Sequence, residues 1–294
     1  MLTEQGLRGI YVPVVTPFHS NGELDLASFE RLASHLLSSG IHGIVVNGTT
    51  GESPVITPDE LKSLIQTAVK VRADRHIPIV VGTGTNDTSS TVMRTELAGQ
   101  LGADAALVVV PYYSRPSQEG IIAHFQQVAT TAVPLIVYEI PARTGVRLTV
   151  DTARTLLNMN NVIGMKDSSG GIELFMELSR FTSKPILCGE DAYFYAMLCC
   201  GAQGSMMASA NVNTRAFVEV FTQFEQGRII ESGQSFTQLL PLIRLLFQEP
   251  NPSPLKWLLA EQGLIASDTV RLPMLPITVE LQEQLTAYQL AART

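Results

Sequence analysis

The chain has little positive charge and very few lysines. Only five of its 294 residues are lysine, and 20 lysines and arginines stand against 27 aspartates and glutamates, which gives a formal net charge of −7. Proteins that bind nucleic acid usually present a basic face. The composition therefore indicates no nucleic-acid partner.

Long hydrophobic runs and paired cysteines are also missing. No apolar run reaches the roughly 18 residues of a membrane span, so we expect no membrane partner. The first ten residues, MLTEQGLRGI, have neither a basic segment nor a long apolar one, and we expect no signal peptide. Three cysteines, Cys188, Cys199 and Cys200, form no CxxC pair. We expect them to be buried reduced thiols in a cytoplasmic protein.

Familiar nucleotide and metal motifs do not occur. GTGTND at 82–87 lacks the last glycine of G-x-G-x-x-G, and neither a G-K-[ST] loop nor a G-x-S-x-G elbow is present. The histidines at 19, 35, 42, 76 and 124 show no paired metal-ligand spacing, which disfavours a metal-dependent aldolase. We expect no cofactor and no metal.

Short apolar runs rich in β-formers alternate with helical patterns along the chain. The runs cover 9–15, 43–47, 77–82, 105–110, 134–140, 162–166, 185–189 and 204–209. Continuous apolar strands are typical of a parallel sheet covered on both faces. Eight such units predict an α/β fold, a (β/α)₈ TIM barrel, with a doubly wound sheet as the alternative.

The strand signal stops near residue 210. We therefore divide the chain into a (β/α)₈ barrel with the active site, 1–210, and a C-terminal helical extension packed on the barrel, 211–294. No polar linker separates the two parts. Within the barrel, TPDE at 57–60 has the pattern of a capping box with proline at the first helical position.

One lysine stands at the end of an apolar strand. VIGMKDSSGG at 162–171 places Lys166 at the mouth of the predicted barrel, where active sites of this fold lie. Desolvation there lowers the pKa of a lysine, and the neutral amine can form a Schiff base with a ketone. The alternative is a lysine that reaches solvent from the rim.

Other strand ends supply groups that such chemistry requires. Tyr138 ends the strand before Lys166, and Tyr112 and Tyr113 end the strand before that, where they could relay protons. GTTG at 48–51 could hold a carboxylate through hydroxyl and N–H groups, and Arg143 could bind a second one. The respective alternatives are aromatic packing for the tyrosines, an ordinary turn for GTTG and a surface ion pair for Arg143.

These motifs, taken together, resemble one enzyme family. GTTGES, PYYSRPSQEG, YEIPARTG, the strand-closing lysine and the EPNPSPLKW segment are similar to the dihydrodipicolinate synthase family, in order and over nearly the whole chain. That family belongs to the pyruvate-dependent class I aldolases, which also include N-acetylneuraminate lyase. The resemblance implies a Schiff-base lyase that condenses pyruvate with L-aspartate 4-semialdehyde to 4-hydroxy-tetrahydrodipicolinate, on the way to diaminopimelate and lysine.

The resemblance also implies the catalytic residues. Lys166 forms the imine and Tyr138 is the general acid and base. Thr49 and Tyr113 complete the proton relay. In the family this second tyrosine of its pair reaches into a neighbouring subunit, which implies a homo-oligomer, usually a homotetramer built as a dimer of dimers.

Substrate-binding residues follow from the same resemblance. Thr50 holds the pyruvate carboxylate together with Thr49, and Arg143 receives the carboxylate of the aldehyde substrate. Gly189 and Met206 fall where the family lines the pyruvate pocket with its backbone.

Some positions depart from the family pattern. Glu139 stands where the synthase commonly has asparagine, and KDSSG also occurs in sugar-acid aldolases. The alternatives are therefore an aldolase acting on a 2-keto-3-deoxy sugar acid or N-acetylneuraminate and, more remotely, a ligand-binding paralogue without catalysis. Ser90 stands where a glutamate binds inhibitory lysine in feedback-regulated members, so we expect weak inhibition by lysine or none.

Overall fold

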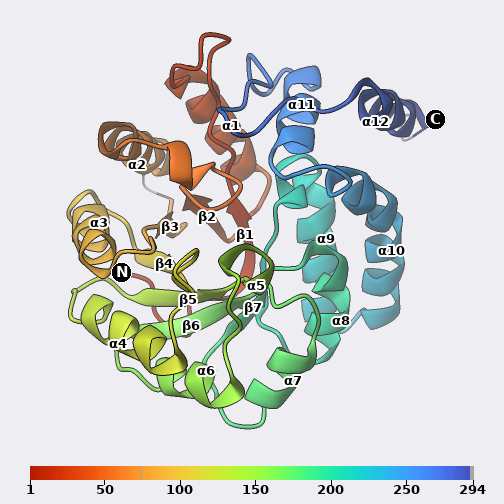
Figure 1. Cartoon of the computed structure of the whole chain (residues 1–294). Coiled ribbons are helices and arrows are strands. Elements are labelled where there is room, and N and C mark those ends of the chain that lie inside the picture. The colour runs from red at the N-terminus through yellow and green to blue at the C-terminus, as the bar shows by residue number, and fades with distance from the viewer. Residues whose placement is uncertain (74, 292–294) are drawn as a thin grey trace. The chain divides into compact units, whose positions relative to one another are not determined.

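The computed structural model describes residues 1–73 and 75–291. Its eight strands pair in chain order and close into a parallel barrel (Figure 1). The strands are β1 (Gly9–Pro13), β2 (Gly43–Val46), β3 (Ile79–Gly82), β4 (Ala105–Val109), β5 (Leu135–Glu139), β6 (Val162–Asp167), β7 (Ile186–Cys188) and β8 (Gly204–Met206). The predicted TIM barrel is confirmed, and the doubly wound alternative is wrong.

Helices follow the strands and continue beyond the last one. They are α1 (Leu26–Ser38), α2 (Pro58–Arg72), α3 (Thr88–Gln100), α4 (Gln118–Val128), α5 (Pro141–Thr144), α6 (Val150–Leu157), α7 (Glu173–Leu178), α8 (Phe194–Cys199), α9 (Thr214–Glu225), α10 (Ile229–Leu246), α11 (Ser253–Glu261) and α12 (Val279–Ala291). Three short 3₁₀ turns, η1 (Ser53–Val55), η2 (Asp191–Tyr193) and η3 (Ser209–Asn211), complete the described elements.

The last two strands are shorter than their apolar runs. β7 begins after Pro185, which has no N–H to donate to a sheet ladder. β8 ends at Met206, although the buried residues Met207 and Ala208 continue the apolar run. The apolar run therefore shows which residues are buried, and it continues beyond the last residue that pairs in the sheet.

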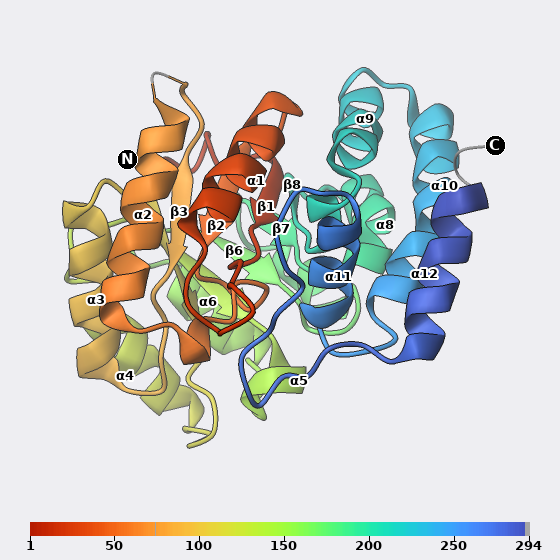
Figure 2. The same ribbon diagram turned by 90° about the horizontal axis from the view of Figure 1, so that it is seen from above.

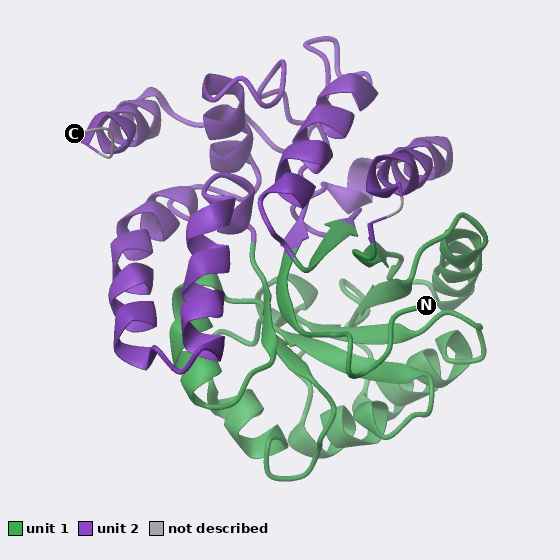
Figure 3. Cartoon of the chain, turned by 180° about the vertical axis from the view of Figure 1, so that it is seen from behind, with its two compact units in different colours: residues 1–11, 42–45, 76–207 green, residues 12–41, 46–75, 208–294 purple. Residues whose placement is uncertain are grey.

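The first compact unit comprises residues 1–11, 42–45 and 76–207, green in Figure 3. Its interior is a cluster of apolar side chains from the strands and the segment before β1. The members are Leu2, Leu7, Tyr11, Val45, Val80, Ala105, Leu107, Ile136, Tyr138, Ile163, Leu187 and Met206. The tyrosine ring of Tyr11 requires glycine at position 43, since a Cβ there would lie 2.2 Å from the ring.

The second compact unit comprises residues 12–41, 46–75 and 208–294, with residues 74 and 292–294 outside the description. In it α1 packs on α2, and α10 packs on α9 and α12 (Figure 2). The long helical run after residue 210 breaks between α9 and α10, where Gly227 has φ +75°. The capping box of α2 is confirmed, since Thr57 Oγ1 accepts from the Glu60 N–H and the Glu60 carboxylate accepts from the Thr57 N–H.

The cysteines and the helices test two further expectations. No disulfide joins the three cysteines, and Cys188 is buried as predicted. The prediction of burial is wrong for Cys199, the exposed last residue of α8, and for Cys200, which is half-buried. The buried positions of α8 are Phe194, Met197 and Leu198 instead. Across the described residues, every helix is too short or too polar to span a membrane.

Candidate active site

The register of β5 and β6 brings Tyr138 beside Lys166. The two residues are direct partners in the parallel ladder, and partners on neighbouring strands point to the same face of a sheet. The Lys166 Nζ atom lies 4.2 Å from the centroid of the Tyr138 ring. Only 6% of Lys166 and 4% of Tyr138 is exposed. The alternative of a lysine that reaches solvent from the rim is therefore wrong.

Gly189 makes room for this pair. A Cβ at position 189 would lie 2.7 Å from the Lys166 Cε atom and 2.1 Å from the Ser168 Oγ atom. The Ser168 hydroxyl is buried and has no hydrogen-bond partner among the described residues. Met206 is buried in the same interior cluster as Tyr138. The structure thus brings four of the predicted residues into one region of the first unit. They are Lys166, Tyr138, Gly189 and Met206.

Tyr113 and Arg143 lie at the surface of the first unit. Tyr113 is 89% exposed and has φ +68°, a conformation that non-glycine residues seldom adopt. Arg143 is exposed on α5, a helix of four residues that starts at Pro141 and ends before Gly145 with φ +73°. No described carboxylate pairs with Arg143, so the alternative of a surface ion pair does not hold within this chain.

Two buried acids flank the tyrosine and the lysine, and sequence reasoning gave them no role. Burial raises the pKa of Glu139 to about 7, and burial also raises the pKa of Asp167. The signal was present in the sequence, because each acid follows a proposed catalytic residue inside a strand. A third acid, Glu190, has its pKa raised by burial and by Asp191, whereas the Lys166 charge lowers it.

Thr49 and Thr50 belong to the second unit, in the turn that follows β2. The turn lies between Asn47 and Glu52, which both have left-handed backbone conformations with φ +59° and +56°. Neither threonine N–H has an acceptor among the described residues. The Thr50 Oγ1 atom accepts a hydrogen bond from Asn251 Nδ2 at 3.1 Å. The turn therefore presents two unpaired N–H donors, as a carboxylate site requires.

A buried ion pair fixes the end of this turn. The Glu52 carboxylate accepts from Lys256 Nζ at 2.8 Å and from the Arg271 N–H at 3.0 Å. Lys256 is completely buried, with its Nζ atom 4.2 Å from the centroid of the Phe18 ring. Burial lowers the pKa of Lys256 to about 8, although the Glu52 charge opposes that change. The left-handed backbone of Glu52 is thus held by contacts of its side chain.

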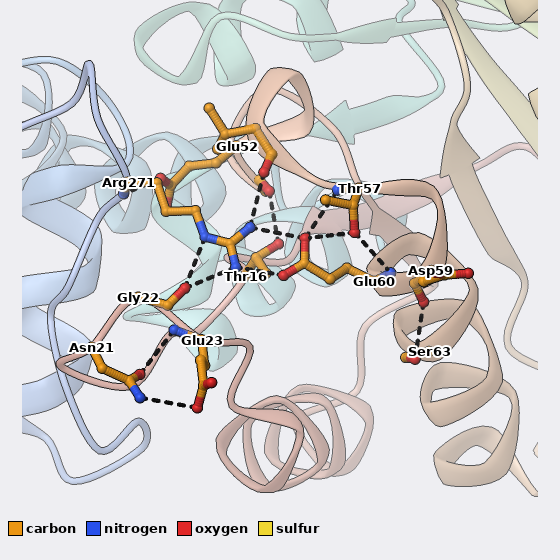
Figure 4. A network of polar contacts seen from close by, with 12 residues as sticks. Thr16, Asn21, Gly22, Glu23, Glu52, Thr57, Asp59, Glu60, Ser63 and Arg271 are labelled. Carbon is orange, nitrogen blue, oxygen red and sulfur yellow. Dashed lines mark hydrogen bonds and ion pairs between the residues drawn. The ribbon is translucent and has the colours of Figure 1, made fainter.

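Arg271 extends the network to other loops of the second unit (Figure 4). Its guanidinium donates to the Gly22 and Val55 carbonyls and forms an ion pair with Glu60. The hydrogen bond from Arg271 is the main reason why the pKa of Glu60 is lowered to about 2. Glu60 therefore caps α2 and anchors Arg271 at once.

The two buried lysines differ in whether a carboxylate lies beside the amine. This matters because only a neutral amine can attack a carbonyl carbon. Lys256 has a carboxylate within hydrogen-bond distance, which favours the ammonium form. Lys166 faces a tyrosine ring and no described ion pair includes it. No described group of three His, Cys, Asp or Glu residues could hold a metal ion. The arrangement suits a carbonyl reaction at Lys166.

A TIM barrel with a buried lysine and tyrosine on adjacent strand ends defines an enzyme class that reacts through a lysine side chain. The chain belongs to the dihydrodipicolinate synthetase family, a family of lyases, whose model matches residues 6–291. It is 38% identical over 285 residues to 4-hydroxy-tetrahydrodipicolinate synthase 2 of Clostridium acetobutylicum, covering 96% of this chain and 99% of that one. It is 40% identical over 280 residues to the Herminiimonas arsenicoxydans synthase, covering 94% and 95%.

Solved structures agree with these relatives. Dihydrodipicolinate synthase from Thermotoga maritima superposes with a TM-score of 0.92 at 35% identity, covering 95% of this chain and 96% of that one. The enzyme from Cyanidioschyzon merolae, described with lysine bound, gives 0.94 at 32% identity and 98% of each chain. The family resemblance read from the sequence is confirmed.

We predict that Lys256→Met will destabilise the protein strongly. The substitution keeps the side-chain length but leaves the Glu52 carboxylate buried without its cation, a loss that typically costs about 3–5 kcal/mol. Lys70→Met is the matched control, because Lys70 pairs with Glu30 at 3.0 Å on the surface and should lose under about 1 kcal/mol. Urea unfolding measures both, and equal losses would contradict the role given to the buried pair.

Proposed function

We propose that this chain condenses pyruvate with L-aspartate 4-semialdehyde to 4-hydroxy-tetrahydrodipicolinate through a Schiff base on Lys166. The observation that carries the proposal is the buried Lys166 Nζ atom, 4.2 Å from the Tyr138 ring centroid at adjacent strand ends. Relatives that bear the synthase name over nearly the whole chain support the identity of both substrates.

The chemistry proceeds in steps that each use one of these groups. The neutral Lys166 amine attacks the pyruvate ketone, water leaves, and an iminium ion forms. Loss of a methyl proton gives an enamine, which attacks the aldehyde carbon. The amine of the second substrate then attacks the imine carbon and releases Lys166. Tyr138 moves the protons of these steps as general acid and base.

The remaining residues bind substrates or pass protons. Thr49 and Tyr113 complete the relay from Tyr138 to solvent. Thr49 and Thr50 hold the pyruvate carboxylate, for which their unpaired N–H groups are suited. Exposed Arg143 receives the carboxylate of the aldehyde substrate.

The pocket wall and the division of the chain complete the proposal. Gly189 and Met206 line the pyruvate pocket. Gly189 suits this place, because a side chain there would collide with Lys166.

We divide the chain into a catalytic barrel, 1–210, and a helical extension, 211–294.

A sugar-acid aldolase is the second candidate. One observation favours it: the buried Ser168 hydroxyl has no described partner and lies next to the position that a Gly189 side chain would occupy beside Lys166. A hydroxylated substrate such as a 2-keto-3-deoxy sugar acid or N-acetylneuraminate could bond to it. The Schiff base on Lys166 is common to both candidates.

Assembly and location are further parts of the proposal. We infer a cytoplasmic homotetramer, in which Tyr113 reaches into a neighbouring subunit. The 89% exposure of Tyr113 and its left-handed backbone support a contact outside its own chain. One structural relative is described as a monomeric dihydrodipicolinate synthase variant, so sedimentation of this chain is an informative experiment.

Pyruvate should be trapped on Lys166 alone. Incubation with pyruvate, borohydride reduction and peptide mass spectrometry should find the adduct on Lys166 and none on buried Lys256. Lys166→Arg should abolish trapping, because a guanidinium stays protonated, while Lys62→Arg on the surface of α2 should leave it unchanged. An adduct on any other lysine would disprove the assignment.

Arg143→Ala should weaken use of the semialdehyde while pyruvate trapping persists. Losing a charge-assisted hydrogen bond costs about 1.5–3 kcal/mol, which lowers kcat/KM for the aldehyde roughly 10- to 150-fold. Arg154→Ala is the control, because Arg154 pairs with Asp151 on the surface. Steady-state kinetics with each substrate varied decides the matter, and an unchanged KM for the aldehyde counts against this role.

Lysine should inhibit this enzyme weakly or not at all. The position aligned with the lysine-binding glutamate is Ser90, and the nearby Asp87 carboxylate already accepts the Ser90 N–H at 2.7 Å. A ligand ammonium without an anionic partner is disfavoured. The measurement is a lysine titration of the condensation rate at saturating and limiting pyruvate. Half-inhibition at sub-millimolar lysine would show that another anion serves the site.

A further inference from the structure

Two buried acids form a second pair one residue beyond the proposed catalytic pair. The ladder that pairs Tyr138 with Lys166 also pairs Glu139 with Asp167. Side chains alternate along a strand, so the two acids share the face opposite to Tyr138 and Lys166. Glu139 is 0% and Asp167 1% exposed. Two buried carboxyl groups therefore project to the same side from partner positions of neighbouring strands.

Each acid uses one oxygen and leaves the other without a partner. Glu139 Oε1 accepts from the Leu148 N–H at 3.0 Å, and Asp167 Oδ1 accepts from the Ser169 N–H at 2.9 Å. Glu139 Oε2 and Asp167 Oδ2 are buried and have no hydrogen bond among the described residues. Orphaned buried oxygens on neighbouring acids are costly unless a proton lies between them.

The charges around the pair do not favour two carboxylates. Arg147 is the cation that lowers the pKa of both acids, and it lies on an exposed segment. Against it stand the charge of Asp167, which raises the pKa of Glu139, and the charge of Glu173 at the start of α7, which raises the pKa of Asp167. Asp167 also raises the pKa of Glu190, which follows β7.

Two neighbouring strand residues complete these surroundings. Cys188 on β7 is the ladder partner of Asp167, and burial keeps the pKa of its thiol well above the usual range. Lys166 projects from the other face of β6. Two like charges in one buried site do not both ionise cheaply, which favours retention of one proton by the pair.

We propose that Glu139 and Asp167 share one proton between Oε2 and Oδ2, and that this hydrogen bond positions the strand ends that bear Tyr138 and Lys166. The link between β5 and β6 continues in the backbone, where the Ser168 N–H donates to the Glu139 carbonyl at 2.9 Å. The positioning role rests on the function proposed above, whereas the shared proton is independent of that function.

The pair also fixes the base of the segment that carries Arg143. The chain leaves β5 at Glu139, forms α5 and returns to Leu148, whose N–H donates to the Glu139 side chain. The ends of this excursion are therefore tied together by one carboxyl group. Glutamine can repeat both contacts of a protonated Glu139, since its carbonyl accepts from Leu148 and its NH₂ group donates to Asp167. Alanine can repeat neither.

The shared proton makes the free energy of unfolding depend on pH. Burial raises the pKa of Glu139 from an ordinary 4.5 to about 7 in the folded state. Between these values the folded protein holds more protons than the unfolded chain, so the free energy of unfolding falls as pH rises through this window. Glu139→Gln removes this term. The Tm of the variant should therefore rise relative to that of the wild type between pH 5 and pH 8.

The first experiment tests the shared proton on the full chain. Infrared spectra of the wild type at neutral pH should contain the carbonyl stretch of a protonated carboxylic acid. Glu139→Gln should remove it, whereas Glu173→Gln, an exposed acid on α7, should not. The proposal is overturned if the band is absent from the wild type or survives Glu139→Gln, or if the Tm difference between Glu139→Gln and wild type stays constant from pH 5 to pH 8.

The second experiment tests positioning by the rate of pyruvate trapping at fixed pH. Glu139→Gln should keep the rate within a few-fold of wild type, and Glu139→Ala should lower it roughly 10- to 100-fold, as misplaced reacting groups do. Equal rates in the two variants would overturn the positioning role. A wild-type protein that traps no pyruvate would instead refute the proposed function and leave the infrared and Tm results to decide on the proton.

Discussion

Parallel pairing of β5 with β6 is the constraint on which the site depends. It sets Tyr138 opposite Lys166 on one face and Glu139 opposite Asp167 on the other. A shift of β5 by one residue would exchange the two faces of that strand, and would turn Glu139 instead of Tyr138 to the face of Lys166. The Tyr138–Lys166 pair and the buried acid pair are thus two results of a single alignment of strands.

Burial has opposite consequences for the two lysines that the protein hides from water. In the second unit Lys256 meets Glu52, and the ion pair holds a turn whose backbone is otherwise unfavourable. In the first unit Lys166 lies over the Tyr138 ring, and no described ion pair includes it. The same side chain is therefore held by a carboxylate in one place and lies beside a tyrosine without one in the other, where we propose that it acts as a nucleophile.

Much of the fold could be read from the sequence, since eight apolar runs separated by helical patterns leave few other arrangements. Lys166 and Tyr138 could be found because each closes such a run, and strand ends gather at one side of a barrel. Lys256 was not distinguished, because its position near a helix start says nothing of Glu52, which lies 204 residues away. The burial of Glu139 and Asp167 could not be predicted either, because it depends on which parts of the chain cover the outer face of β5 and β6.

The most direct test of the account is the reaction itself. Purified protein with pyruvate and L-aspartate 4-semialdehyde should consume the two substrates in equal amounts and with saturation. Cleavage of 2-keto-3-deoxygluconate under the same conditions should have the lower kcat/KM. Faster cleavage of the sugar acid than condensation of the semialdehyde would contradict the assignment of the second substrate, and no turnover of either compound would contradict the proposed role of Lys166.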